Sequence, residues 1–202
     1  MRYLSCILAI LMSLCVAACG FQSGAKYVPS DYVSQPIVSS EDGIALAEQV
    51  AHRWDSSAYL VSITGVYRPE EKGFELIQSY YNFVSGDAMK YIGVTIRSSG
   101  DIQVDLPAKV EGSFVTTEPY AVDPGDISEP QALELAWVRL GSALMDTCGP
   151  VESISIERTN LFSGKPIWSL TYFGHEALLG DITLDTVTGE ATYENINENF
   201  CK

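Results

Sequence analysis

The stretch 165–193, KPIWSLTYFGHEALLGDITLDTVTGEATY, constrains the fold most because apolar and polar residues alternate through three consecutive segments. A period of two places successive side chains on opposite faces of a strand. Polar residues at the alternate positions indicate antiparallel strands with one face in water, which excludes a doubly wound nucleotide-binding sheet. The turn from Asp185 to Glu190 contains Thr188 and Gly189, and we expect Gly189 to supply a positive φ while Asp185 accepts bonds from turn N–H groups.

A helix and a further strand precede this stretch. Ser128 and Gln131 have the spacing of a capping box, and an apolar stripe at helical spacing follows through residues 129–146. Gly149 and Pro150 end that pattern, and residues 151–158 alternate as a strand does. Residues 128–202 therefore predict one helix packed on an antiparallel sheet, with a C-terminal tail.

A looser copy of the same pattern occupies residues 39–106. Ser40-Glu41 opens its helix as Ser128-Glu129 opens the second, and strand patterns follow near 58–67, 74–84, 89–97 and 102–105. Residues 107–127, which contain Pro, Gly and several acids, predict a linker. The fold class expected is α+β, with two similar helix-on-antiparallel-sheet units; chance similarity of two helix-plus-strand segments is the alternative.

The N-terminus carries a targeting signal. Arg2 precedes the apolar run Leu4–Val16, which is too short to span a bilayer as a helix. Val-Ala-Ala-Cys19 resembles the lipobox of bacterial lipoproteins, in which the Cys is acylated after cleavage before it. The resemblance implies a signal peptide at 1–18, a lipidated Cys19 and a flexible tether over 19–38. Gly20 in place of Asp implies the outer membrane, facing the periplasm. An ordinary secretory signal is the alternative.

The cysteine count follows from that cleavage. Cys6 and Cys15 leave with the signal peptide and Cys19 takes the lipid, so Cys148 and Cys201 remain. In an oxidising envelope two remaining thiols predict one disulfide, which would tie the C-terminal tail to the end of the second helix. Two free or intermolecular thiols are the alternative.

The order of these elements resembles the PepSY domain. The residues that carry the resemblance are the Ser-Ile strand, the aromatic-Ser-Leu-Thr-Tyr strand and the ending Asp185, Thr188, Gly189 and Glu190. The match covers 129–193, and 40–105 is a degenerate copy that lacks the Asp. PepSY-like modules are envelope-exposed or secreted and are associated with regulation or inhibition of peptidases. Their architecture looks like that of tandem-repeat β-lactamase-inhibitor proteins. The resemblance implies a protein-binding module without a cofactor.

Charge and motif content limit the chemistry. A net charge of −14 opposes a nucleic-acid partner, because phosphate binding requires a basic surface. His52 and His175 are interpreted as solvated surface residues, although a Cys148–His175 dyad is conceivable. Asp181, Asp185 and Glu190 lack the dense ligand spacing of a calcium loop. We therefore expect no enzyme activity, no cofactor and no metal.

Aromatic residues in the predicted strands are the candidate partner-binding side chains, because aromatics on an open sheet face anchor protein partners well. Core filling is the alternative for each, since strand parity alone does not show which face the helix covers. The sequence thus predicts a lipid-anchored envelope module that binds a protein or peptide and, by the resemblance, regulates or inhibits a peptidase. An envelope assembly or scaffolding lipoprotein is the alternative. The five candidates are Tyr81, Phe83, Tyr91, Trp168 and Tyr172.

Overall fold

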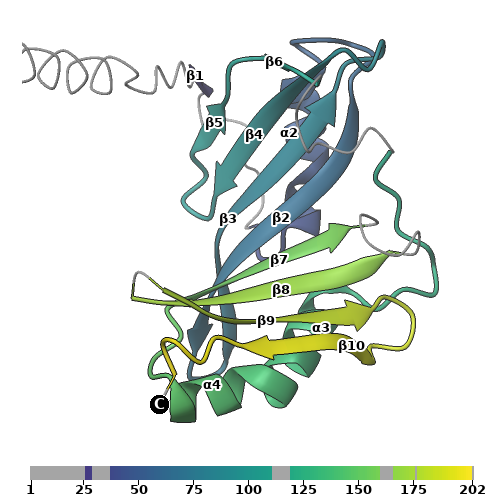
Figure 1. The fold of residues 1–202 in the computed structure, drawn as a ribbon. Coiled ribbons are helices and arrows are strands. Elements are labelled where there is room, and N and C mark those ends of the chain that lie inside the picture. Colours follow the sequence, from purple (N-terminus) through teal and green to yellow (C-terminus); the bar gives the residue numbers. More distant parts are fainter. Residues whose placement is uncertain (1–25, 29–36, 111–118, 160–165, 176, 202) are drawn as a thin grey trace, which may run out of the picture.

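The computed structural model describes residues 26–28, 37–110, 119–159, 166–175 and 177–201 (Figure 1). The predicted signal peptide, the lipidation site Cys19 and most of the predicted tether lie outside the described residues. Within the described residues, no helix is both long enough and apolar enough to cross a membrane.

One antiparallel sheet dominates the fold, which confirms the α+β class (Figure 1). Its order is β1-β5-β4-β3-β2-β7-β8-β9-β10, and the two-residue β6 pairs with β4. The strand bounds are β1 (Lys26–Val28), β2 (Tyr59–Glu70), β3 (Gly73–Val84), β4 (Lys90–Arg97), β5 (Ile102–Val104), β6 (Ala108–Lys109), β7 (Ser153–Thr159), β8 (Ile167–Gly174), β9 (Ala177–Asp185) and β10 (Ala191–Ile196).

The centre of the sheet is the antiparallel pair β2–β7, which joins the two halves of the chain. Thr64 pairs with Glu157 and Tyr67 with Ile154. Consecutive strands then run outward from this pair in each half, β3 to β5 on one side and β8 to β10 on the other. The sequence predicts a helix and antiparallel strands in each half, but not this pairing across the predicted linker.

The helices follow the expected apolar stripes. The first comprises the short helix η2 (Glu41–Gly43) and α2 (Ile44–Ala51). The second comprises α3 (Glu129–Ala136), a π-helical segment η3 (Trp137–Gly141) and α4 (Ser142–Thr147). The capping box at Ser128 is present, and its N–H donates to Gln131 Oε1 at 2.8 Å. Gly149 follows the helix with φ of 100°.

Both helices pack on the same face of the sheet, and Figure 1 shows α2 behind β2–β4 and α3–α4 next to β10. The buried residues form two clusters, one between α2 and β2–β5 and one between α3–α4 and β7–β10. Tyr67 and Leu76 of the β2–β3 hairpin belong to the second cluster, so this hairpin extends from its own half into the other. Within the described residues, no helix covers the opposite face of the sheet.

Candidate functional site

A buried polar cluster joins the start of η2 in the first half to the start of α3 in the second half. Glu129, at the start of α3, is 1% exposed. Its Oε2 accepts hydrogen bonds from the Ser40 N–H at 3.1 Å and from Ser40 Oγ at 2.6 Å. The Ser40 carbonyl accepts a bond from the Tyr81 hydroxyl at 2.6 Å. These bonds connect the beginning of η2, strand β3 and α3.

The space for this carboxyl is created by a glycine in the central strand. A Cβ on Gly65 would lie 2.4 Å from Glu129 Oε1, so any larger residue would displace the carboxyl. Oε1 has no hydrogen-bond partner among the described residues. Burial raises the pKa of Glu129 to about 7, although hydrogen bonds from Ser40 and Tyr67 oppose the rise. The cluster therefore titrates near neutral pH.

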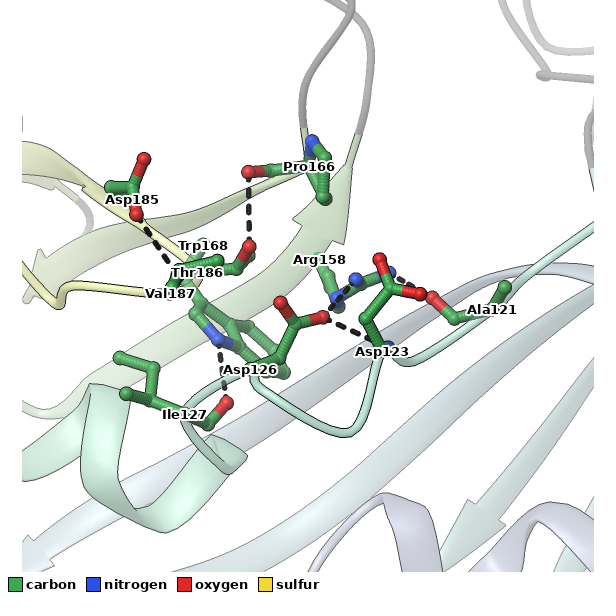
Figure 2. Close-up of polar contacts among 10 residues, drawn as sticks. All are labelled: Ala121, Asp123, Asp126, Ile127, Arg158, Pro166, Trp168, Asp185, Thr186 and Val187. Atoms are coloured by element: carbon green, nitrogen blue, oxygen red, sulfur yellow. Dashed lines mark hydrogen bonds and ion pairs between the residues drawn. The ribbon is translucent and has the colours of Figure 1, made fainter.

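A second buried polar cluster fastens the chain before α3 to the sheet (Figure 2). The Arg158 guanidinium of β7 pairs with Asp126 and also donates to the Ala121 carbonyl. The side chains of Arg158 and Asp126 are 5% and 1% exposed. The Asp123 N–H donates to Asp126 at 3.1 Å, and the Arg158 guanidinium lies 5.8 Å from the centre of the Tyr120 ring.

Backbone and indole contacts continue this attachment. The Trp168 indole N–H donates to the Ile127 carbonyl at 3.2 Å (Figure 2). The Ile127 N–H donates to the Thr186 carbonyl at 2.6 Å. Arg158 pairs with Trp168 in the β7–β8 ladder, so one side chain of each strand holds the same segment. Residues 119–127 are thus part of the packed structure, and the described part of the predicted linker is not a free connection.

The disulfide and the β9–β10 turn are the two stabilising features predicted from the C-terminal half. Cys148 and Cys201 are joined by a disulfide, with a Cα–Cα distance of 4.0 Å, which holds the tail beside the end of α4. In the β9–β10 turn, Asp185 Oδ1 accepts bonds from the N–H groups of Val187 and Thr188 at 2.9 and 2.8 Å. Gly189 has φ of 70°. These residues build the turn.

The prediction that strand aromatics form an exposed partner-binding face is wrong for four of the five candidates. Tyr81, Phe83, Trp168 and Tyr172 are buried in the core. They have the strand parity that faces the helices, and large apolar surface is most stable there. Tyr91 is half-buried near the start of β4.

The sheet face opposite the helices is mainly polar. The side chains on this face alternate with the core residues along each strand and form rows across the sheet. Because most of them are polar, the face has few apolar anchors. Glu157 lies in the middle of this face at the β2–β7 pair, and burial raises its pKa. One continuous row of cross-strand partners consists of Thr95, Tyr80, Thr64, Glu157, Ser169 and Thr183.

An open apolar surface lies on the helix side, along the outer face of α3 and η3. Leu135 and Val138 are 45% and 78% exposed although they belong to a helix that packs on the sheet. They line a hollow of about 630 Å³ together with Ile127, Gln131, Glu134, Arg139 and Gly189.

A second hollow, of about 320 Å³, shares Glu134 and Val138 with the first and continues to the tip of the β2–β3 hairpin at Glu70, Glu71 and Phe74. A third shares Glu70 and Phe74 with the second. The shared residues make these hollows neighbours along α3 and the hairpin tip, and together we call them the α3 groove.

The π-helical segment forms the middle of the α3 groove. Trp137 begins η3 and packs edge-on against Phe74, with the ring centres 5.7 Å apart. A Cβ on Gly141 would lie 2.3 Å from the Trp137 ring, so the glycine makes room for the indole. Isolated π-helical turns are rare and occur frequently at functional sites. This turn places Trp137 at the edge of the core and Val138 in solvent.

The histidines and acids considered in the sequence make local contacts. His52 Nε2 contacts the Ala58 carbonyl at 3.0 Å, and His175 lies 3.6 Å from Glu152 on the surface. Asp181 accepts a hydrogen bond from Asn195 at 3.0 Å. No group of metal-ligating side chains is present within the described ranges.

Three features of the site have a weak signal in the sequence. Leu135 and Val138 are apolar residues outside the apolar stripe of their helix, which is the signal for an exposed apolar face. Glu129 and Arg158 are charged residues adjacent to buried positions, but charge at a helix start or strand end is also typical of solvated residues.

Comparison with family models, with curated proteins and with solved structures gave no match. The resemblance to the PepSY domain therefore stays a prediction.

Proposed function

We propose that this protein is a lipid-anchored component of the bacterial envelope that binds a protein or peptide without catalysing a reaction. Lipid attachment at Cys19 would hold it at the outer membrane, facing the periplasm. The PepSY-like resemblance extends the proposal to regulation or inhibition of a peptidase.

The observation that carries the binding function is the α3 groove. Contiguous exposed apolar surface bordered by polar residues marks interaction sites in soluble proteins. Leu135, Val138 and the half-buried Trp137 supply that surface on a helix held rigidly by the core. The groove replaces the strand aromatics as the candidate binding surface.

The symmetry of the strand order supports the finer proposal that the two halves are copies of one unit. In each half a helix precedes four antiparallel strands that run outward from β2 or β7. Ser40 and Ser128 directly precede the first residues of their helices, as the matching sequence pairs predict. A tandem arrangement of this kind is what the resemblance to PepSY-like repeats implies.

The polar open face of the sheet favours the second candidate function, an envelope assembly or scaffolding lipoprotein. A face rich in Ser and Thr has few anchors for tight binding, whereas sheet edges can pair with another chain. β10 is the last strand in the sheet order and is largely exposed. Under this alternative, partners would contact the edge of the sheet and leave the groove free.

Replacing Cys19 with Ala is expected to release the protein from membranes, because no acyl chains would then remain to anchor it. Fractionation of cells into membrane and soluble periplasmic material, followed by immunoblotting, measures the effect. A Cys148→Ala variant is the matched control and should remain in the membrane fraction. Cys19→Ala protein that stays with membranes would contradict the anchor.

Photo-cross-linking in intact cells tests the binding function. A benzophenone amino acid at Val138 is expected to give a discrete adduct with an envelope protein, because Val138 protrudes into the groove. The same amino acid at Met145, which is exposed on α4 outside the three hollows, is the control. Adducts equal at both positions, or none at Val138, would refute groove binding; adducts only from β10 positions would favour the scaffolding alternative.

A further inference from the structure

We propose that the α3 groove binds a cationic amphipathic segment of its partner, with apolar side chains seated on Leu135 and Val138 and Lys or Arg side chains directed at its acidic rim. This inference rests on the proposed binding function and specifies the chemistry of the partner. The charges that surround Leu135 and Val138 favour a cationic ligand.

The rim of the groove carries an excess of available negative charge. Glu134 borders the first and second hollows, and Glu70 and Glu71 border the second at the hairpin tip. All three are exposed, and within the described part of the chain none has an ion-pair partner. The carboxylates are therefore free to meet cations of a ligand.

The positive charges near the groove do not balance these acids. Arg139 borders the first hollow, but its guanidinium is paired with Glu194 of β10. Lys72 borders only the third hollow, where Glu70 and Glu75 also lie. A ligand with acidic residues beside its apolar ones would meet like charge at the rim, and juxtaposed like charge suppresses binding.

The shape of the groove sets the form of the segment. Acidic and apolar side chains are neighbours along the second helix. Glu134 of the rim directly precedes Leu135 of the floor, and Val138 of the floor lies about one helical turn after both. An amphipathic helix presents apolar residues at the same spacing with polar residues beside them, which is the usual helix-in-groove mode of recognition. The net charge of −14 also repels an anionic lipid surface, so a protein segment is the occupant that the charge favours.

The test uses purified, lipid-free Cys19→Ala protein and two designed helical peptides of equal length. Both peptides have leucines at the same positions; one has lysines and the other glutamates at every polar position. Fluorescence anisotropy is expected to show binding of the lysine peptide that weakens as salt is added, because exposed charges are screened. The glutamate peptide is expected to bind at least about tenfold more weakly.

Two matched charge variants separate the groove from general attraction to an acidic protein. The rim variant Glu70→Gln/Glu71→Gln/Glu134→Gln is expected to lower affinity for the lysine peptide about tenfold, since each exposed pair contributes a few tenths of a kcal/mol or more. The distal variant Glu48→Gln/Asp146→Asn/Glu198→Gln removes three exposed acids outside the groove and should leave affinity unchanged. Equal loss in both variants would overturn the proposal.

A floor variant, Leu135→Ser/Val138→Ser, distinguishes failure of this inference from failure of the proposed function. It is expected to abolish binding of the lysine peptide while circular dichroism shows the native fold, because both residues are exposed. If both peptides bind equally and the floor variant blocks both, the cationic preference is refuted and groove binding stands. If neither peptide binds, the preference is refuted, and the Val138 cross-link decides the proposed function separately.

Discussion

Replacing Arg158 with Met is expected to lower the free energy of unfolding by about 3–5 kcal/mol. The substitution keeps the aliphatic length of the side chain but removes the charge, which leaves the Asp126 carboxylate buried without its cation. The Ala121 carbonyl would lose its donor as well. Urea unfolding followed by circular dichroism measures the change, with an unaltered m-value showing that the native fold is retained.

The surface pair Arg68–Glu75 is the matched control for that substitution. Its side chains are each 54% exposed, so Arg68→Met is expected to cost under about 1 kcal/mol. The double variant Arg158→Met/Asp126→Leu should recover much of the loss, because replacing both partners of a buried pair removes the unpaired charge. A cost for Arg158→Met no larger than for Arg68→Met would show that the pair contributes little.

The fold is predictable from the sequence where the signal is local. Alternation, helical spacing and the capping residues at Ser128 depend on neighbours within a few positions, and the strands and both helices follow them closely. The β2–β7 pair depends on residues that are far apart in the chain, such as Thr64 and Glu157. Nothing in the local pattern of either strand specifies that partner, so the single continuous sheet could not be predicted.

The candidate site shows the same limit. Strand periodicity places Tyr81 and Tyr172 on a definite face of the sheet but does not say which face the helices cover. In the structure the helices cover the face that carries these two tyrosines, so both are buried. Val138 lies outside the apolar stripe of the second helix, so helical spacing already indicates its exposure, but the hairpin tip beside it comes from a distant segment and has no local signal. The burial of Glu129 requires Gly65 beneath it, a contact between distant segments.

The buried Glu129 makes stability depend on pH in a definite direction. Its pKa is raised above the ordinary value of 4.5, chiefly because burial disfavours the charged carboxylate, with the nearby Glu41 charge adding to the rise. Between pH 4.5 and about 7 the unfolded chain therefore releases this proton while the folded chain retains it. The folded state binds more protons in that window, so stability falls as pH increases through it.

The Glu129→Gln variant is expected to remove this part of the pH dependence. A pKa raised from 4.5 to about 7 corresponds to about 3 kcal/mol. The variant should match the parent protein in acid, where the carboxyl is neutral, and should be more stable by about that amount above neutral pH. Urea unfolding of both proteins between pH 4.5 and about 7 gives the difference in their free energies of unfolding at each pH. Contributions of other carboxyls such as Glu157 are the same in both proteins and drop out of this difference.

Glu134→Gln is the control on the same helix, because it makes the same substitution at an exposed glutamate. Parallel curves for Glu129→Gln and the parent protein would show that the carboxyl between the two halves stays charged when folded. In that case the bonds from Ser40 would outweigh burial, and Glu129 would be a charged hydrogen-bond acceptor that does not titrate near neutral pH.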